Sequence, residues 1–396
     1  MIRLLIGAPG LPWRHLRALI RQVLPLFAIW RLALWLVGGL GLWYSSALHS
    51  YAKTVATDGM IVERTQFPWK VLVEGWLRWD SAHYLTIATK GYSFFDERWP
   101  NIAFFPLYPL LIRLFLPLTT HRAEISALAI SHFAIFAALL LLYDLITRDF
   151  NEVLARRTLI LLLVFPMSFF FISGYTESLA LALTVLAMWA LRQQRWWLAG
   201  LAGFFLALTR VPGVFVAPVL VIEYLQQHKW NWRKLLHGPI LSVVLPPLGL
   251  ALFILFQWQQ FGTPFAFMIA QQSWENNELS PPWVMPTLLF QRYHHAPDWP
   301  LITFYLLTWI GFIGLIVVAF VRLPLSYGLL MLLLLFPSYL TSWHRSLPRH
   351  LMIGFPAFVV MALLLEQIWL RRFVIAIFGI FLAFCTLLFV NAFWVA

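Results

Sequence analysis

The sequence predicts an all-α, polytopic transmembrane protein with about eleven spans. Of its 396 residues, 61% are hydrophobic and only 11% are charged, whereas charged residues make up about a quarter of a soluble domain. The apolar stretches run to roughly 20 residues, the length that a helix needs to cross about 30 Å of hydrocarbon. Strands of a membrane barrel would be about 10 residues long with alternating polarity. We therefore expect the spanning elements to be helices.

The first predicted span, residues 23–48, follows Arg14, Arg17 and Arg21. It is longer than the core of a signal peptide and has no obvious cleavage site, so we expect an uncleaved anchor. Residues 201–209 and 213–224 are short for a bilayer, which predicts a broken or tilted pair of helices around the sequence TRVPG. The spans expected after the first are residues 124–147, 157–173, 177–191, 197–209, 213–224, 238–259, 301–321, 325–341, 351–369 and 373–395.

Two long loops interrupt the apolar pattern, residues 49–122 and residues 260–300. Inside the first, residues 102–118 are apolar but contain three prolines and Arg113, so we expect a re-entrant or interfacial segment. With that choice, most basic clusters fall on the cytoplasmic side and both loops fall outside, as the positive-inside tendency predicts. No internal repeat or low-complexity linker divides the chain, so residues 1–396 are treated as one membrane domain.

The net charge of +12 comes from short basic clusters between apolar runs. This scatter is typical of topology determinants and does not favour nucleic-acid binding, which needs a basic stripe. Cys385 is the single cysteine, which excludes an internal disulfide and a cysteine-based metal site. His294, His295 and Asp298 are close in sequence, but adjacent side chains diverge and no further ligand pair has suitable spacing, so no metal site is predicted.

The stretch RWDSAHYLTIATKGY, residues 78–92, places Asp80 at the start of a predicted helix. Asp80, His83 and Tyr84 share one face of that helix by their spacing of three and four residues, with Trp79 beside them. One interpretation is an aromatic belt helix in which Asp80 caps the N-terminus or pairs with Arg78. The other is a general base at the membrane surface that takes a proton from an acceptor hydroxyl.

Two charged residues begin or separate later apolar stretches. Glu177 begins an apolar helix, where an acid complements the helix dipole. Arg210 lies between two apolar stretches, where an arginine is costly unless it pairs or meets water. Its ligand is predicted to be either Glu177 or a phosphate.

The stretch SWHRSLPRHL, residues 342–351, is rich in basic side chains although its loop is expected to face outward. It contains His344, Arg345, Arg349 and His350. A phosphate-bearing ligand would explain arginines on that side. Contact with anionic lipid head groups is the alternative.

RWDSAHYLTIATKGY followed by AFFPLYPLL, and then FFFISGYTESLALAL, resemble the family of the second mannosyltransferase of GPI-anchor synthesis, often called PIG-V-like. The order and spacing of these motifs agree, and the likeness extends from about residue 79 to residue 349. FGTPFAFMIAQQSW, residues 261–274, is similar to the G-D-P-x-A-F loop of related prokaryotic membrane glycosyltransferases, with Thr263 where an acid is common. TRVPG and SLPRH are similar to the family's later arginine positions, as shorter matches.

The resemblance implies a GT-C architecture, in which the first outward loop carries a catalytic Asp and the donor is a polyprenyl-phosphate sugar. It makes Asp80 the candidate base, with Trp79 and Tyr84 around it and Glu177 as a second polar site residue. The acid that follows GY in the family corresponds to Asp96 or Glu97. The predicted substrate-binding residues are Trp79, His83, Tyr84, Glu97, Glu177, Arg210, Arg345 and Arg349.

The implied reaction is an inverting transfer of mannose to a lipid-linked or cell-envelope acceptor, with arginines stabilising the departing phosphate. We expect the site on the non-cytoplasmic face, in the cell membrane if the source is prokaryotic, and no cofactor beyond the donor substrate. The expected partners are the lipid-linked donor, a glycolipid acceptor and membrane lipids, without nucleic acid. A transporter or flippase of a lipid-linked sugar is the alternative, and a non-catalytic scaffold subunit is a third; a transporter should show polar residues at mid-membrane depth and an internal repeat.

Overall fold

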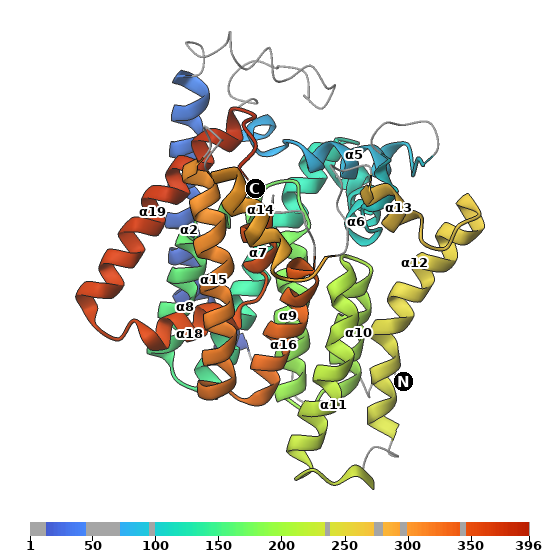
Figure 1. The fold of residues 1–396 in the computed structure, drawn as a ribbon, viewed down its shortest axis with the longest axis vertical. Helices are drawn as coiled ribbons and strands as arrows, with labels where there is room; N and C mark the ends of the chain where they lie inside the picture. Colours follow the sequence, from blue (N-terminus) through green and yellow to red (C-terminus); the bar gives the residue numbers. More distant parts are fainter. Residues whose placement is uncertain are drawn as a thin grey trace.

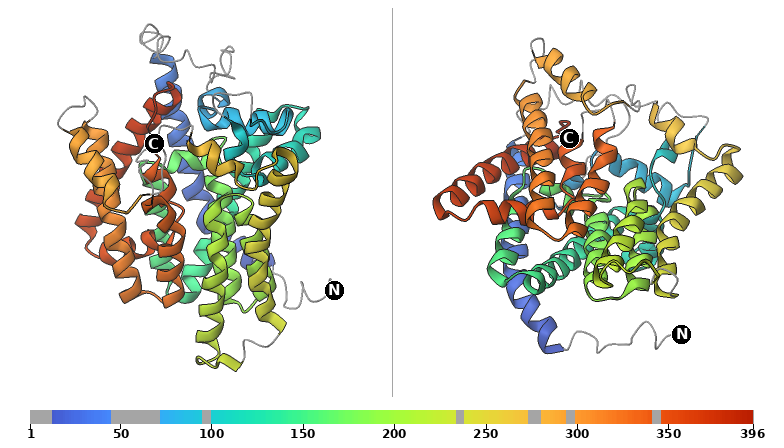
Figure 2. Two further views of the ribbon diagram at one scale, coloured as in Figure 1. Left: turned by 45° about the vertical axis from the view of Figure 1, so that its right-hand side comes forward. Right: turned by 60° about the horizontal axis from the view of Figure 1, so that its bottom comes forward.

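The computed structural model describes residues 13–44, 72–94, 100–233, 238–272, 280–293, 299–340 and 346–395. Every regular element in these ranges is a helix. The longer helices stand side by side as a bundle, and several short helices lie together at one end of it (Figures 1 and 2). The all-α prediction is therefore confirmed for the described residues.

Three kinds of helix make up this arrangement. The bundle contains α2 (Trp13–Tyr44), α7 (Ala123–Asp149), α8 (Glu152–Val164), α9 (Glu177–Arg192), α10 (Trp196–Ala207), α11 (Val216–Gln227), α12 (Leu245–Phe261), α15 (Trp299–Arg322), α16 (Leu325–Tyr339), α18 (Pro356–Leu364) and α19 (Ile368–Val390). The shorter α-helices are α5 (Asp80–Thr89), α6 (Leu107–Phe115), α13 (Ala266–Gln272), α14 (Val284–Tyr293) and α17 (Leu347–Leu351). The 3₁₀ turns are η1 (Glu74–Trp76), η2 (Asn101–Ala103), η3 (Leu116–Thr119), η4 (Ser168–Ile172), η5 (Val211–Phe215) and η7 (Gly238–Val244).

Five helical stretches of the described chain are long and apolar enough to cross a membrane: Trp13–Trp43, Ala123–Asp149, Gly238–Phe261, Ile302–Arg322 and Ile368–Val390. Their outer faces expose large apolar side chains, among them Trp258, Leu307 and Val321. Lipid covers such faces in an integral membrane protein. The other apolar helices are shorter, so the count of eleven spans remains a prediction.

The helix break predicted at TRVPG is confirmed, because α10 ends at Ala207 and η5 begins at Val211. The prediction of one span over residues 157–173 is wrong at its end. Helix α8 ends at Val164, directly before Phe165 and Pro166, because proline lacks a backbone donor and disfavours helical geometry in the residue before it. The turn η4 takes the place of the remaining residues.

The last break also differs from the prediction, which placed it between residues 369 and 373. The chain breaks at residues 365–367, and Arg371 lies in the first turn of α19. The Arg371 guanidinium donates to the carbonyls of Leu365 and Glu366, at 2.9 and 3.0 Å. A side chain that satisfies the free carbonyls after a helix stabilises the break at that point.

The segment at residues 102–118 forms α6 and η3 rather than a long helix. Nine helical residues rise only about 14 Å, less than half the thickness of the hydrocarbon. Arg113 donates to the carbonyl of Ala88 at 2.7 Å, which joins α6 to the end of α5. Helices α5, α6 and α13 therefore form a layer at one end of the bundle (Figure 2).

The opposite end of the bundle carries a buried charged cluster, which we name the Arg192 cluster. Arg192 ends α9 and lies 2.8 Å from Asp149 of α7 and 2.9 Å from Glu223 of α11. Tyr327 of α16 donates to the same Asp149 carboxylate at 2.7 Å. Helix α9 begins with Glu177 and ends with Arg192, so the Arg192 cluster lies a whole helix away from the Glu177 carboxylate.

Candidate active site

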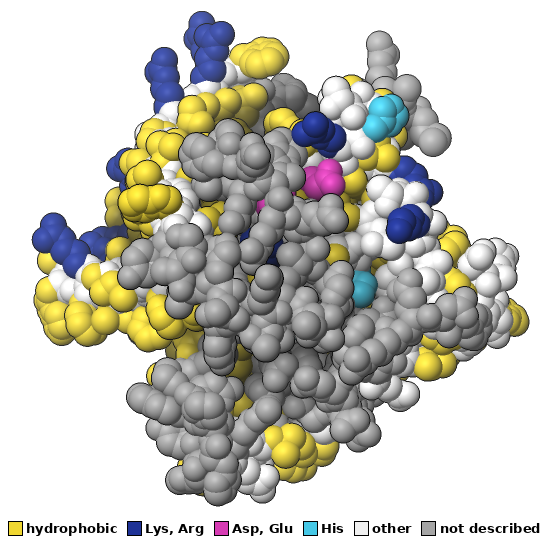
Figure 3. All heavy atoms as spheres, turned by 90° about the horizontal axis from the view of Figure 1, so that it is seen from above, with side chains coloured by type: hydrophobic (Ala, Val, Ile, Leu, Met, Phe, Trp, Pro, Cys, Tyr) yellow, Lys and Arg dark blue, Asp and Glu magenta, His cyan; other side chains and the backbone are white. Residues whose placement is uncertain are grey.

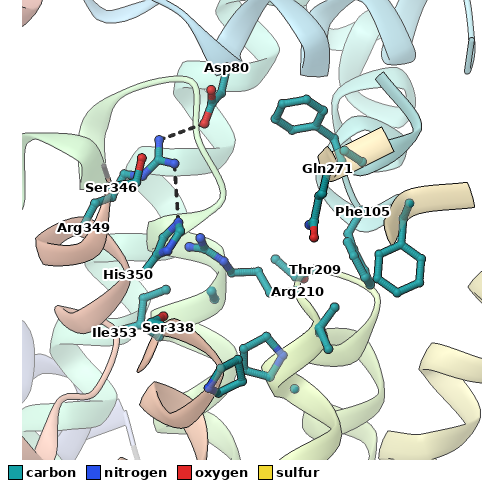
Figure 4. A pocket seen from close by; sticks show the side chains of 18 of the residues that line it. Asp80, Phe105, Thr209, Arg210, Gln271, Ser338, Ser346, Arg349, His350 and Ile353 are labelled. Atoms are coloured by element: carbon teal, nitrogen blue, oxygen red, sulfur yellow. Dashed lines mark hydrogen bonds and ion pairs between the residues drawn. The ribbon is translucent and has the colours of Figure 1, made fainter. Parts of the chain in front are cut away.

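A cavity of about 680 Å³ is lined by residues of α5, α9, α10, α13, α16 and α17. Figure 3 views this end of the molecule, where acidic, basic and histidine side chains are visible together toward the upper right. Figure 4 shows Asp80 above the cavity, Arg349 and His350 on one side, and Gln271 and Phe105 on the opposite side. Apolar side chains also line the cavity, among them Leu206, Val211, Pro212, Leu334, Pro337 and Ile353.

Hydrogen bonds of Arg78 hold this part of the chain in place, two residues before Asp80. They link it to the end of α19 and to the turn before α9. Arg78 donates through two nitrogens to the carbonyl of Val390, at 3.2 and 2.9 Å, at the end of α19. Tyr175 donates to the carbonyl of Arg78 at 2.8 Å. Asp80 begins α5, and no side chain caps that helix. The Asp80 carboxylate is therefore not a helix cap, and Asp80 lines the cavity.

Four charged residues form a continuous chain of ion pairs, which we name the charge chain. Arg349 Nη1 lies 2.8 Å from Asp80 Oδ2, and Arg349 Nε lies 3.3 Å from Glu177 Oε1. Arg210 Nη1 lies 3.0 Å from the same Glu177 oxygen. The second oxygen, Oε2, is buried without a hydrogen-bond partner among the described residues. Two arginines thus share two carboxylates at the cavity.

Burial and neighbouring charges fix the protonation of these groups. Burial lowers the pKa of Arg349, but Asp80 and Glu177 raise it further, so the net shift is upward and the guanidinium stays charged. Burial, Arg210 and Arg349 together hold the pKa of His350 well below its ordinary value. This imidazole is neutral, and its Nε2 accepts from Arg349 Nη2 at 3.5 Å. A neutral imidazole beside two guanidinium groups avoids additional repulsion.

Comparison of the whole sequence with protein families gives a match to the family described as Mannosyltransferase (PIG-V) over residues 42–288. That range covers more than half of the 396 residues. The chain belongs to the PIG-V mannosyltransferase family. The matched range contains Asp80, Glu177 and Arg210, whereas Arg349 lies beyond it.

Curated proteins similar to this chain are also named as mannosyltransferases. GPI alpha-1,6-mannosyltransferase 2 of Rattus norvegicus is 29% identical over 218 residues, which cover 49% of this chain and 43% of the rat protein. The Mus musculus protein of the same name is 31% identical over 218 residues, with the same coverage. The match therefore spans less than half the length of these relatives.

Among solved structures, ArnT from Cupriavidus metallidurans, in a crystal structure bound to undecaprenyl phosphate, has a similar fold. The TM-score is 0.50 at 15% sequence identity, over 82% of this chain and 60% of the ArnT chain. At this identity the likeness concerns the fold alone. It confirms the GT-C-like architecture that the sequence predicted for this PIG-V family member.

The structure brings most of the predicted site residues together. Asp80, Tyr84, Arg210 and Arg349 line the cavity, and Glu177 joins the two arginines. Burial, Glu177 and Asp80 raise the pKa of Tyr84, so its hydroxyl keeps its proton. The interpretation of Arg210 as a partner of Glu177 is confirmed, and the same arginine also faces the cavity.

The other predicted residues have different positions. His83 stacks on Phe104, with ring centroids 4.5 Å apart, so it supports the cavity wall from behind. Trp79 packs edge-to-face against Trp394. Glu97 and Arg345 lie outside the described residues, as do Asp96, His294, His295 and Asp298.

Several lining residues are not among the predicted site residues of this PIG-V family chain. His350 follows Arg349 directly, and its position in the SLPRH stretch was a usable signal. Gln271 lies in FGTPFAFMIAQQSW, the stretch that the sequence already likened to a site loop. Trp394 lies near the end of the last predicted span, residues 373–395, and no local pattern marked it as a site residue. No group of three potential metal ligands occurs within the described ranges of the chain.

Proposed function

We propose that this protein is an inverting membrane mannosyltransferase that moves mannose from a polyprenyl-phosphate carrier to a hydroxyl of a lipid-linked or cell-envelope acceptor. One observation carries the proposal: in a PIG-V family chain, the charge chain lies at a cavity that apolar side chains also line. A lipid phosphate likewise combines an anionic head group with an apolar chain. The cavity therefore suits a phosphate beside the arginines and lipid carbons beside Pro337 and Leu334.

In the proposed step, the acceptor oxygen attacks the anomeric carbon from the side opposite to the phosphate. The new carbon–oxygen bond forms as the bond from that carbon to the phosphate oxygen breaks, and the electron pair leaves with the phosphate. Asp80 takes the hydroxyl proton as general base. A single displacement inverts the anomeric configuration and forms no covalent intermediate with the protein.

Arg349 and Arg210 would stabilise the negative charge on the departing phosphate. Arg349 is paired with Asp80 at 2.8 Å. A phosphate near Arg349 competes with Asp80 for the guanidinium. Donor binding would therefore release the carboxylate for its role as base and make the donor the first substrate to bind.

We further propose that the step needs no metal ion and no cofactor. Both carboxylates of the charge chain are engaged by guanidinium groups, which already supply positive charge where the phosphate departs. Transfer should continue unchanged in excess chelator. Loss of transfer in chelator that returns on adding a divalent cation would contradict this.

The site is proposed to face the non-cytoplasmic side, in the cell membrane of a prokaryotic source. Arg148, Arg192 and Arg322 lie in the last turns of α7, α9 and α15, at the end opposite the cavity. Basic residues favour the cytoplasmic side. Residues 1–396 are proposed to act as one domain, with residues 49–122 and 260–300 as outward loops, since α5 and α13 both border the cavity end.

The experiment is transfer of labelled mannose from synthetic polyprenyl-phosphate mannose to a membrane lipid extract by the purified protein. Wild type should transfer, and Asp80→Asn should lose about a hundredfold or more, the usual contribution of a general base. Glu124→Gln is the matched control, because Glu124 lies in the first turn of α7 and does not line the cavity. Binding of the donor without any transfer would contradict the enzyme proposal and favour a transporter.

A further inference from the structure

The segment after α19 forms part of the cavity wall. Trp394 lines the cavity, although it lies more than 100 residues beyond the matched family range. Asn391 donates to the carbonyl of Gly41 at 3.2 Å, and Tyr305 donates to the carbonyl of Val395 at 3.4 Å. With the two bonds from Arg78 to Val390, these contacts fix the segment on both sides of Trp394.

Trp394 meets Trp79, the residue before Asp80. Their rings are edge-to-face, with centroids 5.1 Å apart and an interplanar angle of 86°. Trp79 has a positive φ of 51°, which is uncommon for a bulky residue. The surrounding contacts therefore hold Trp79 in a geometry that the chain alone would not choose.

Both indole groups have an unused donor. The Nε1 atoms of Trp79 and Trp394 are buried and have no hydrogen-bond acceptor within the part of the chain that the structure describes. A buried donor without an acceptor is costly, and tryptophan normally finds a partner for this group. The two donors belong to neighbouring rings beside the proposed base, and Trp394 lines the cavity, which points to a ligand with several acceptor oxygens.

A pyranose ring has this chemistry. Its C–H faces are apolar enough to pack on an indole, and its hydroxyl oxygens accept hydrogen bonds from indole N–H groups. The charged phosphate is better matched by Arg349 and Arg210, which are already at the cavity. The sugar and the phosphate thus have separate proposed partners, the indole rings for the sugar and the two arginines for the phosphate.

We propose that Trp394, supported by Trp79, is a positioning residue that receives the pyranose ring of the donor and makes the site select the sugar-bearing lipid over the bare lipid phosphate. The inference rests on the proposed function, because it assigns the sugar subsite of that donor. Each residue of the Arg78–Trp79–Asp80 sequence then has its own role. Arg78 anchors the end of α19, Trp79 supports Trp394, and Asp80 accepts the proton.

The test compares two ligands, polyprenyl-phosphate mannose and polyprenyl phosphate, in direct binding to purified wild type, Trp394→Ala and Trp394→Phe. Trp394→Ala should weaken binding of the mannosylated lipid about tenfold, which corresponds to about 1.4 kcal/mol, and change binding of the bare lipid less than about twofold. Trp394→Phe keeps a ring but loses the N–H donor and should fall between wild type and alanine. Trp369→Ala, an exposed tryptophan near the start of α19, is the matched control and should bind both ligands as wild type does.

Equal weakening of both ligands, or of neither, would overturn the assignment of Trp394. If Trp394→Ala does not fold, the Phe variant decides, since loss of one N–H group must still separate the two ligands. Transfer assays distinguish a failure of this inference from a failure of the proposed function. If Trp394→Ala loses the discrimination between the two lipids but wild type transfers no mannose, the result contradicts the proposed enzyme and not this inference. If Trp394→Ala transfers mannose and binds both lipids as wild type does, the result contradicts this inference and not the proposed enzyme.

Discussion

Arg349 Nη1 lies 2.8 Å from Asp80 Oδ2, although the two residues are 269 positions apart in the sequence. The central carbon of the guanidinium also lies 5.1 Å from the ring centroids of both Phe170 and Tyr175. A cation fixed by two rings and two carboxylates has little freedom to reorient. This pairing is what positions the acid of the first loop against the last third of the chain.

Replacing Arg349 with Met is expected to reduce both stability and mannosyl transfer. Its side chain is 6% exposed and contacts Asp80 and Glu177 through different nitrogens, so its removal leaves two carboxylates with Arg210 as their remaining cation. Breaking a buried pair in this way costs about 3 kcal/mol. Thermal unfolding in detergent measures the first effect, and kcat for donor turnover measures the second.

A double-mutant cycle shows whether that cost comes from the pair. Asp80→Asn combined with Arg349→Met removes both charges, so it should be more stable than Arg349→Met alone. Arg349→Lys, a point charge that cannot contact both carboxylates as the guanidinium does, should fall between wild type and Met in transfer. Strictly additive stability changes would show that the two residues are not coupled.

Gly213→Ala is expected to lower transfer about tenfold or more by displacing Arg210. A Cβ atom at Gly213 would lie 2.2 Å from the backbone nitrogen of Ala207, so η5 would have to move away from α10. Arg210 lies directly before η5 and moves with it. The assay is transfer at saturating donor, beside Gly311→Ala, whose Cβ meets no atom within 4 Å. Equal activity of the two variants would contradict this role of the TRVPG turn.

Stability should fall as the pH drops below about 6.5, in part through His350. Burial, Arg210 and Arg349 hold its pKa well below the ordinary 6.5, so the folded protein keeps the imidazole neutral where the unfolded chain binds a proton. The unfolded state then binds more protons, and each such group contributes a slope of up to about 1.4 kcal/mol per pH unit. His350→Gln should lose part of this slope between pH 6.5 and pH 5, as measured by thermal unfolding. An unchanged slope would mean that other groups produce it.

Arg192→Met should destabilise the protein without altering the affinity for the donor. Arg192 joins Asp149 and Glu223, whose side chains are 9% and 1% exposed, at the end opposite the cavity. Removing the cation leaves two buried carboxylates, at a cost of about 3 kcal/mol. The KM for the donor, measured on the folded fraction below the lowered Tm, should equal that of wild type. A raised KM for the donor in fully folded Arg192→Met protein would indicate coupling between the two ends of the bundle.

The pattern of apolar runs predicted the helices of the bundle, and the predicted bounds 177–191 and 301–321 lie within two residues of those of α9 and α15. It failed where a single residue acts through the backbone, as Pro166 does after α8 and Arg371 does at the start of α19. The family-like motifs predicted Asp80, Tyr84, Glu177, Arg210 and Arg349 as site residues, and the structure groups all of them at one cavity or in its ion pairs.

The sequence by itself determined the class of protein, the apolar helices and the identity of the charged residues, because length, hydropathy and local spacing are properties of neighbouring positions. Only the tertiary structure decided that one guanidinium pairs with both Asp80 and Glu177, and that Trp394 lines the cavity and packs against Trp79. Such contacts depend on packing between helices hundreds of residues apart. Apolar residues that face lipid and apolar residues that line a cavity look alike in sequence, and the packing of the bundle separates them.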